Sequence, residues 1–355
     1  MTFAKPSALA AGAAALLTLP AVQAEERVQV LASFSVLADM VEQIGGDHVE
    51  VTSLVGADSD AHVFTPRPTD ARALAEADLV VLNGLQFEGW MSRLVEASDY
   101  AGPTVVATDG IEQALGEAAH ADEAEHGHDA HAQEDGHDEH GHEASGHEEA
   151  SHEASGHAGH AHAHEGMNPH VWLDLGLGEL YVNNIRDGLI AVDPAHEADY
   201  RERAADYQQR IDALDAEVRA LMDELPEHTA VITGHQSFNH FSRAYGVDFL
   251  SPAGLSTEAE PSAARMAELI EVINDQGVQA LFQENMTSPA IIEQLAEETG
   301  LPIAGTLYSG ALASEGEAST WLGMVRHDAW LLHDALATED AAHDHADHDH
   351  DHADH

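Results

Sequence analysis

Three histidines of the chain lie in short, distinctive stretches that are far apart in the sequence. His62 stands in DAHVFTPRP, His170 in NPHVWLD and His235 in TGHQSF. Neutral imidazole is a favoured zinc ligand, and three imidazoles leave one tetrahedral position for a further group. The chain contains no Cys, so imidazoles and carboxylates are the side chains from which a zinc site can be built. Spacing alone also fits three unrelated surface or core histidines.

Short apolar runs alternate with helical patterns on both sides of these histidines. The predicted strands are 28–32, 49–55, 79–82, 104–107, 229–233, 247–250, 278–282 and 302–304. The predicted helices are 35–44, 68–77, 261–274, 288–299 and 321–336. This alternation predicts α/β architecture with mostly parallel sheets. In such sheets ligands bind beyond the carboxyl ends of the strands, so loops carrying the three histidines can meet at a cleft between two lobes.

A long helix is predicted between the two groups of strands. Its apolar positions alternate in spacing between four and three residues, which makes one continuous apolar seam. These positions are Tyr200, Ala204, Tyr207, Ile211, Leu214, Val218, Leu221 and Leu225. Pro226 ends the helix. Because α/β sequence lies on both sides, a helix that packs along two lobes is favoured over an isolated coiled coil.

Residues 116–166 interrupt the globular pattern and consist almost wholly of Ala, Gly, Ser, Asp, Glu and His. The few apolar side chains in this segment cannot offset the conformational entropy that would be lost on ordering. We therefore predict a disordered His-rich insert at 116–166 and a disordered His/Asp tail at 339–355. Of the 28 His, 13 lie in 120–164 and 6 in 343–355. These imidazoles would bind additional zinc weakly, in competition with protons below pH about 6.5. The alternative is a solvated spacer.

The charge balance limits the possible partners. The chain has 65 Asp and Glu against 13 Lys and Arg, a net charge of −52. A chain this acidic is repelled by nucleic acid and by anionic membranes, so both are excluded as partners and cations are favoured. The acidic surface of a halophilic protein is an alternative, compatible explanation for much of this charge.

The amino-terminal residues have the pattern of a secretory signal. Lys5 precedes an apolar run over 8–19, and small residues then lead to an expected cleavage after Ala24. An uncleaved anchor is the alternative, but the run is short for a membrane span. Because no Cys follows the signal, we expect a free periplasmic protein that is not a lipoprotein.

The chain resembles the periplasmic zinc-binding proteins that serve ABC importers, a family with two lobes joined by one rigid helix. The resemblance extends from about 28 to 336 and is carried by the stretches 60–70, 168–174, 234–246 and 257–261. The His-rich insert lies where zinc members often carry one. This resemblance implies a protein that binds zinc and delivers it to the importer's permease in the inner membrane.

The resemblance also implies the ligands and the metal. By it, His62, His170 and His235 hold one Zn²⁺ in the cleft. A manganese-type relative typically has Glu where His235 stands, so the sequence leans to zinc. Many relatives carry an Asp ligand where Gly310 stands, and others use an acidic residue where Ala61 stands. The fourth ligand is therefore open.

Four groups are candidates for this fourth ligand: water, Asp60, Glu284 and a histidine of the insert. His240, five residues after His235, is expected to pack rather than to bind metal. Asp174 is expected either to accept a hydrogen bond from a ligand histidine or to cap the segment that follows it.

The expected organisation is α/β, with two Rossmann-like lobes whose parallel sheets are linked by one long helix. The expected parts are a signal peptide at 1–24, an N-terminal lobe at 25–190, a linking helix at 195–225, a C-terminal lobe at 226–338 and the tail. We expect a monomer that binds and releases metal and is not an enzyme.

Two rival functions remain from the sequence. A zinc hydrolase also uses three histidines and an open position, but the chain has no His-Glu-x-x-His phrase and no evident general base beside the three His. A periplasmic zinc buffer without an importer is the other rival.

Overall fold

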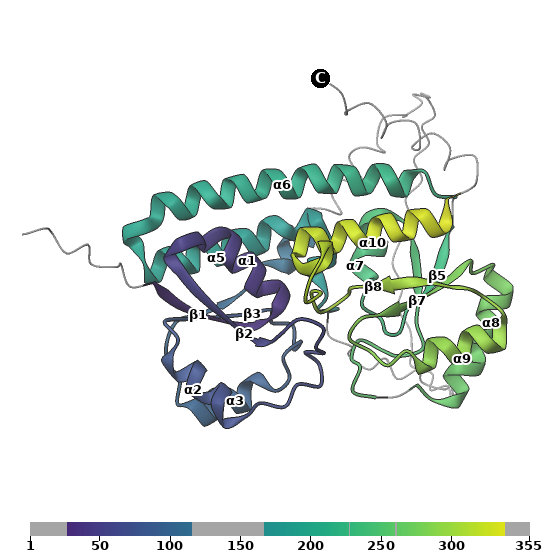
Figure 1. Cartoon of the computed structure of the whole chain (residues 1–355), viewed down its shortest axis with the longest axis horizontal. Helices are drawn as coiled ribbons and strands as arrows, with labels where there is room; N and C mark the ends of the chain where they lie inside the picture. Colours follow the sequence, from purple (N-terminus) through teal and green to yellow (C-terminus); the bar gives the residue numbers. More distant parts are fainter. Residues whose placement is uncertain (1–26, 116–166, 227, 260, 338–355) are drawn as a thin grey trace, which may run out of the picture.

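The computed structural model describes residues 27–115 and 167–337, except 227 and 260 (Figure 1). The predicted signal peptide, the His-rich insert and the His/Asp tail therefore lie outside the described residues. Within the described ranges, no helix is both long enough and apolar enough to cross a membrane.

The N-terminal lobe is built on a parallel sheet of four strands in the order β2-β1-β3-β4. Its strands are β1 (Val28–Phe34), β2 (Val49–Val55), β3 (Leu79–Leu82) and β4 (Thr104–Val106). Its helices are α1 (Ser35–Gly45), α2 (Pro68–Glu76), α3 (Met91–Ser98) and α5 (Gly178–Val192). The predicted strands are confirmed, whereas α3 was not predicted and α5 was not separated from the long helical region that follows it.

The C-terminal lobe repeats this topology with the order β6-β5-β7-β8. Its strands are β5 (Ala230–Ile232), β6 (Asp248–Leu250), β7 (Ala280–Glu284) and β8 (Ile303–Leu307). Its helices are α7 (Asn239–Tyr245), α8 (Ala263–Gln276), α9 (Ala290–Thr299) and α10 (Trp321–Leu336). Helix α8 begins two residues later than predicted because the Ser262 hydroxyl caps it by accepting from the Arg265 amide.

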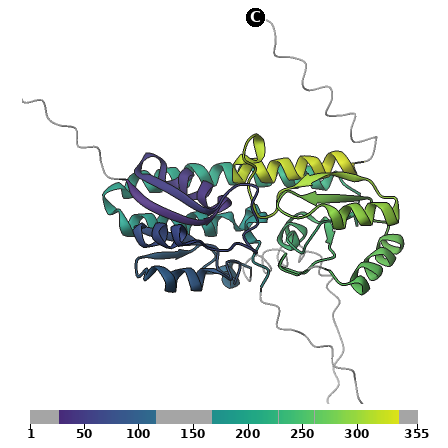
Figure 2. The same ribbon diagram turned by 60° about the horizontal axis from the view of Figure 1, so that its bottom comes forward.

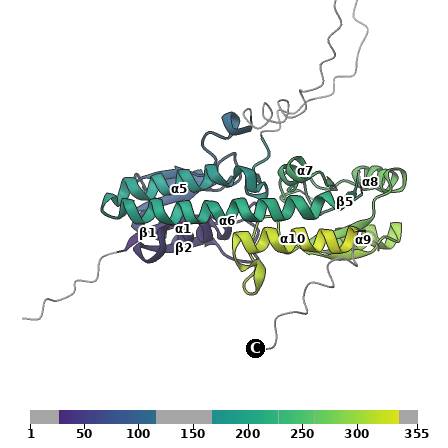
Figure 3. The ribbon, with the colours of Figure 1, turned by 90° about the horizontal axis from the view of Figure 1, so that it is seen from above.

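Helix α6 (Glu197–Asp223) joins the lobes and is 27 residues long, or about 40 Å at 1.5 Å per residue. It lies along both lobes in Figure 1, and Figure 3 shows α5 and α10 beside it. The predicted seam is buried from Tyr200 to Leu221. One apolar core therefore continues from the N-terminal lobe through α6 and α10 into the inner part of the C-terminal lobe.

The outer part of the C-terminal lobe has its own, smaller core. Side chains of β5, β7, α8 and α9 form it, among them Ile232, Leu269 and Leu295. The two lobes lie side by side in Figure 2. The fold class expected from the sequence, two parallel α/β lobes linked by a long helix, is confirmed.

Short 3₁₀ turns complete the connections between these elements. They are Gly46–His48, Val171–Leu173, Leu175–Leu177, Pro194–His196 and Glu317–Ser319. The turn at Val171–Leu173 follows His170 directly and is buried. Because this turn is packed into the core, it fixes where the preceding histidine can lie.

Candidate metal centre

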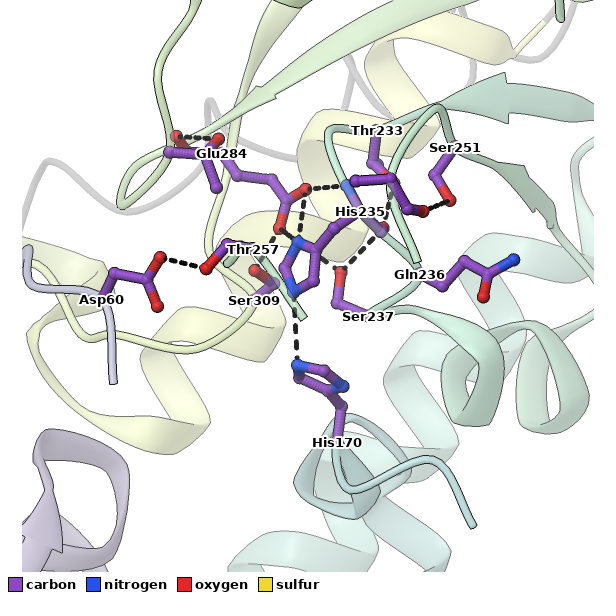
Figure 4. Close-up of polar contacts among 12 residues, drawn as sticks. Asp60, His170, Thr233, His235, Gln236, Ser237, Ser251, Thr257, Glu284 and Ser309 are labelled. Atoms are coloured by element: carbon purple, nitrogen blue, oxygen red, sulfur yellow. Dashed lines mark hydrogen bonds and ion pairs between the residues drawn. The ribbon is translucent and has the colours of Figure 1, made fainter. Parts of the chain in front are cut away.

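The loop after β2 brings His62 from the N-terminal lobe to the junction with the C-terminal lobe. The Asp60 carboxylate accepts the amide of His62 at 2.8 Å, which forms a local turn. The Trp90 indole donates to the Ala61 carbonyl at 2.8 Å. The Thr257 hydroxyl, from the other lobe, donates to the Asp60 carboxylate at 2.5 Å (Figure 4). These contacts fix the backbone around His62 and join the lobes beside it.

His170 is oriented by the asparagine two residues before it. The Asn168 side-chain oxygen accepts the His170 amide at 3.0 Å and faces its Nδ1 at 2.8 Å. The Asn168 amide nitrogen donates to the Gln236 carbonyl at 2.8 Å, so its oxygen must face His170. His170 Nδ1 therefore carries the proton in the neutral ring, and Nε2 presents a lone pair.

His235 follows β5 and is oriented by Glu284, the last residue of the neighbouring strand β7. A Glu284 carboxylate oxygen accepts both the His235 amide and its Nδ1–H at 3.0 Å (Figure 4). The other oxygen accepts from the hydroxyls of Ser309 and Ser237. Since Nδ1 donates to the carboxylate, Nε2 of His235 presents a lone pair in the neutral ring, which is the form that binds a metal.

The three imidazoles converge through their Nε2 atoms. Nε2 of His170 lies 3.1 Å from that of His62 and 3.3 Å from that of His235. One nitrogen from each ring lies within 4.8 Å of the others, and the group can hold one metal ion. The edges of a tetrahedral Zn–N₃ site are about 3.3–3.4 Å long for bonds of 2.0–2.1 Å. The spacing therefore fits a small divalent cation.

Burial favours the neutral form of His62 and His170. Their side chains are almost wholly inaccessible, with relative exposures of 8%, 0% and 1% for His62, His170 and His235. Burial, aided by the neighbouring His235, lowers the pKa of His62 to about 3. Burial first, and then the adjacent histidines, hold the pKa of His170 well below its usual value.

Glu284 is the charged partner of this site. Burial alone would raise the pKa of Glu284, but the His235 charge and the hydrogen bonds from His235 and Ser309 outweigh it and lower the pKa. Glu284 therefore stays ionised and makes the His235 ring a stronger donor to a cation. Its role was not predicted from the sequence because strand pairing between β5 and β7 creates it.

Two aromatic side chains wall the N-terminal side of the site. The Phe87 ring contacts His62 edge-on at 4.7 Å between centroids, and the Trp172 ring lies 5.2 Å from His170. The Trp172 indole donates to the Ser309 carbonyl of the other lobe at 2.8 Å. These apolar faces keep water from the rings and fix their angles.

The structure restricts the candidates for a fourth ligand. Both oxygens of Asp60 are engaged, by the His62 amide and the Thr257 hydroxyl. Both oxygens of Glu284 are engaged behind His235. A Cβ added at Gly310 would lie 3.0 Å from the Met286 sulfur, so a side chain at that position would require the Met286 side chain to shift by a few tenths of an ångström. Histidines of the insert lie outside the described residues.

Two further predictions have clear outcomes. The His240 ring contacts the Asn168 carbonyl at 2.9 Å and supports the loop before His170, so it packs as expected. Asp174 accepts the Gly176 amide at 2.9 Å and pairs with Arg243. Of the two roles expected for Asp174, the structure therefore shows the cap.

Comparison with known proteins places this geometry among metal carriers. A family model described as "Zinc-uptake complex component A periplasmic" matches residues 30–335. The "Metal ABC transporter substrate-binding lipoprotein FimA" of Streptococcus parasanguinis is 28% identical over 309 residues, which cover 83% of this chain and 84% of that protein. The "Manganese ABC transporter substrate-binding lipoprotein PsaA" of Streptococcus pneumoniae is 27% identical, with 82% and 83% covered.

A solved structure with the same fold is the periplasmic zinc-binding protein TroA from Treponema pallidum. It superposes with a TM-score of 0.71 and 26% identity, and the match covers 88% of this chain and all of that one. TroA therefore shares the architecture of this chain, and the FimA and PsaA matches each cover more than four fifths of it.

Proposed function

Since the chain belongs to the zinc-uptake complex component A periplasmic (ZnuA) family, we propose that it binds Zn²⁺ through His62, His170 and His235. We further propose that it delivers this zinc to the permease of an ABC importer. The family consists of solute-binding proteins that act outside the cytoplasm and are not enzymes. The expectation that the chain is not an enzyme is thereby confirmed, and the hydrolase alternative is set aside.

One observation carries the choice of zinc. All three side chains that converge are imidazoles, and no carboxylate oxygen of the described residues joins their group. Imidazole nitrogens suit zinc, whereas carboxylate, carbonyl and water oxygens suit manganese. The relative PsaA is named for manganese, whereas TroA is named as a zinc-binding protein. The donor set of this chain supports the zinc choice.

A direct competition tests this choice. The metal-free protein is titrated with Zn²⁺ and Mn²⁺ in turn against a chelator of known affinity. We expect one tight zinc site per chain, manganese binding weaker by at least about a hundredfold in line with the Irving–Williams order, and loss of the tight site in His170→Ala. Equal affinity for the two metals would contradict the zinc assignment.

The fold suggests how metal release is controlled. Helix α6 shares one core with both lobes, which opposes large lobe movements, so metal binding would act mainly on the loops around the site. The contact between Asp60 and Thr257 joins loops of opposite lobes directly beside His62. We propose that the permease recognises these loops in their metal-bound arrangement. Identical loops in metal-free and zinc-bound structures would contradict this step.

Other parts of the functional prediction stay open to test. The cleavage after Ala24 and the absence of a lipid anchor concern residues outside the described part, and several relatives are named lipoproteins. Weak zinc binding by the His-rich insert and tail, and a monomeric state, stay predictions. Mass spectrometry of the protein exported by its native host would show where the mature chain begins.

A further inference from the structure

We propose that Glu258, a carboxylate on the C-terminal lobe, completes the coordination of the metal at the open side of the three-histidine site. This inference rests on the proposed function of that site. It concerns a residue that the sequence did not single out and that lies 23 positions after His235.

The position of Glu258 relative to His62 is the first argument. Both residues line a cavity of about 200 Å³ that also touches Phe87, Met167 and Pro169. Both residues also line a second cavity, of about 620 Å³, together with Val63, Phe64 and Trp90. Glu258 is the acidic side chain that borders each of these two cavities. A metal that approaches His62 through either one passes this carboxylate.

The loop of Glu258 is already tied to the loop of His62. Thr257, the preceding residue, donates its hydroxyl to Asp60 at 2.5 Å, and Asp60 in turn holds the His62 amide at 2.8 Å. The Glu258 amide donates to the Ser256 hydroxyl at 3.2 Å, which shapes the turn. The backbone beside Glu258 is therefore held close to the metal site from the opposite lobe.

The state of the carboxylate itself is the second argument. Asp60 and Glu284, the other acidic residues near the three rings, have both oxygens engaged by hydrogen bonds. Among the described residues, no hydrogen bond or ion pair engages the Glu258 side chain, which is exposed. Its oxygens do not lie within 4.8 Å of all three ligand nitrogens, so Glu258 is an unengaged carboxylate that would move toward the histidines to bind the metal.

The charge of the occupied site is the third argument. Three neutral imidazoles and a divalent cation would place two positive charges in a buried site, and Glu284 balances one of them from behind His235. Burying an uncompensated charge is unfavourable. A second carboxylate would complete the charge balance and supply the fourth tetrahedral ligand, and the ligand set would still consist mainly of the imidazole nitrogens that suit zinc. An exposed carboxylate can also exchange with water, which suits a site that must release its metal.

Substoichiometric Co²⁺ added to the full metal-free chain reports the coordination directly. Co²⁺ occupies zinc sites and its visible spectrum is sensitive to the ligand set, while azide binds an open or water-occupied position. In the wild type we expect a spectrum that azide does not change. In Glu258→Gln we expect azide to change the spectrum and zinc affinity to fall about tenfold or more. Glu258→Asp should lie between the two.

Glu297→Gln is the matched control because it makes the same charge change on an exposed residue of α9. It should behave as the wild type. If Glu258→Gln has the same zinc affinity and the same azide response as Glu297→Gln, the inference is overturned while the three-histidine site stands. If the wild-type spectrum survives His170→Ala, the cleft site itself is wrong, and the inference falls with it.

Discussion

Among the described residues, each lobe buries one glutamate beside the end of its third strand, and the two glutamates have different neighbours. In the N-terminal lobe, Glu88 accepts from the Ser33 hydroxyl at 2.6 Å and from the amides of Asn83 and Gly84 at 2.7 and 3.2 Å. In the C-terminal lobe, Glu284 accepts from the ring and the amide of His235. The first holds a loop and the second orients a proposed metal ligand.

The pKa values of the two carboxyls move in opposite directions. Burial raises the pKa of Glu88, and its hydrogen bonds only partly oppose this effect. Burial also acts to raise the pKa of Glu284, but the charge of His235 and the hydrogen bonds at Glu284 lower it overall. The two glutamates occupy similar positions in lobes of the same topology. Whether each has a structural or a functional role therefore depends on the side chains that contact its carboxylate.

Among the substitutions that test this difference between the two glutamates, the largest expected effect is on zinc affinity. Glu284→Gln removes the charge behind His235 and should weaken zinc binding by about 10–100-fold. Glu88→Gln should leave zinc affinity within about threefold, because Glu88 contacts none of the three histidines. Competition with a chromophoric chelator measures both variants. Equal losses in the two would mean that Glu284 acts only through the fold.

A smaller effect is expected on the stability of the metal-free protein. Glu88→Ala leaves the Ser33 hydroxyl and the Asn83 amide buried without their acceptor, which should cost about 1–3 kcal/mol of unfolding free energy. Urea denaturation followed by circular dichroism measures this loss. Folded Glu88→Ala should still bind zinc with nearly unchanged affinity, and a loss of metal binding in the folded variant would contradict the structural role.

The smallest effect is a difference in pH dependence. Glu88 has a raised folded-state pKa, so its contribution to stability is fully present below the unfolded value of about 4.5 and is lost as pH rises through the folded value. Glu284 has a lowered pKa, so its contribution is present above about pH 4.5 and is lost as pH falls through the folded value.

Glu88→Gln should therefore flatten the decline in stability above pH 4.5, and Glu284→Gln should flatten the decline below it. Urea midpoints of the metal-free variants between about pH 3 and 7 give the two slopes. Changes of the same sign in both variants would show that His235 does not set the ionisation of Glu284.

Much of the fold could be predicted because the spacing of apolar residues indicates where the strands and helices lie. The strands Val49–Val55 and Leu79–Leu82 and the helix Trp321–Leu336 have the predicted bounds, and the α6 seam is buried as predicted. Helix α5 was not separated from α6, since the break at Asp193 and the short turn after it interrupt two helical patterns only briefly. The antiparallel packing of α5 against α6 depends on tertiary contacts, which the helical pattern of the sequence does not report.

The site could be predicted only where its residues lie in distinctive stretches. The three histidines were named from such stretches, and the structure brings them together. Asn168 lies two residues before His170, so its role could have been read from that spacing. Glu284 and Glu258 are different, because strand pairing and the contact between lobes place them and no local spacing signals either.

The zinc content and competitive zinc affinity of a variant without residues 117–165 and 340–355 test the central claim most directly. This variant retains every residue of the folded site and lacks the His-rich insert and tail. We predict that about one zinc stays tightly bound and is lost in His62→Ala. If tight binding disappears with the deleted segments, or persists in His62→Ala, the three-histidine site is not the centre at which this protein holds its metal.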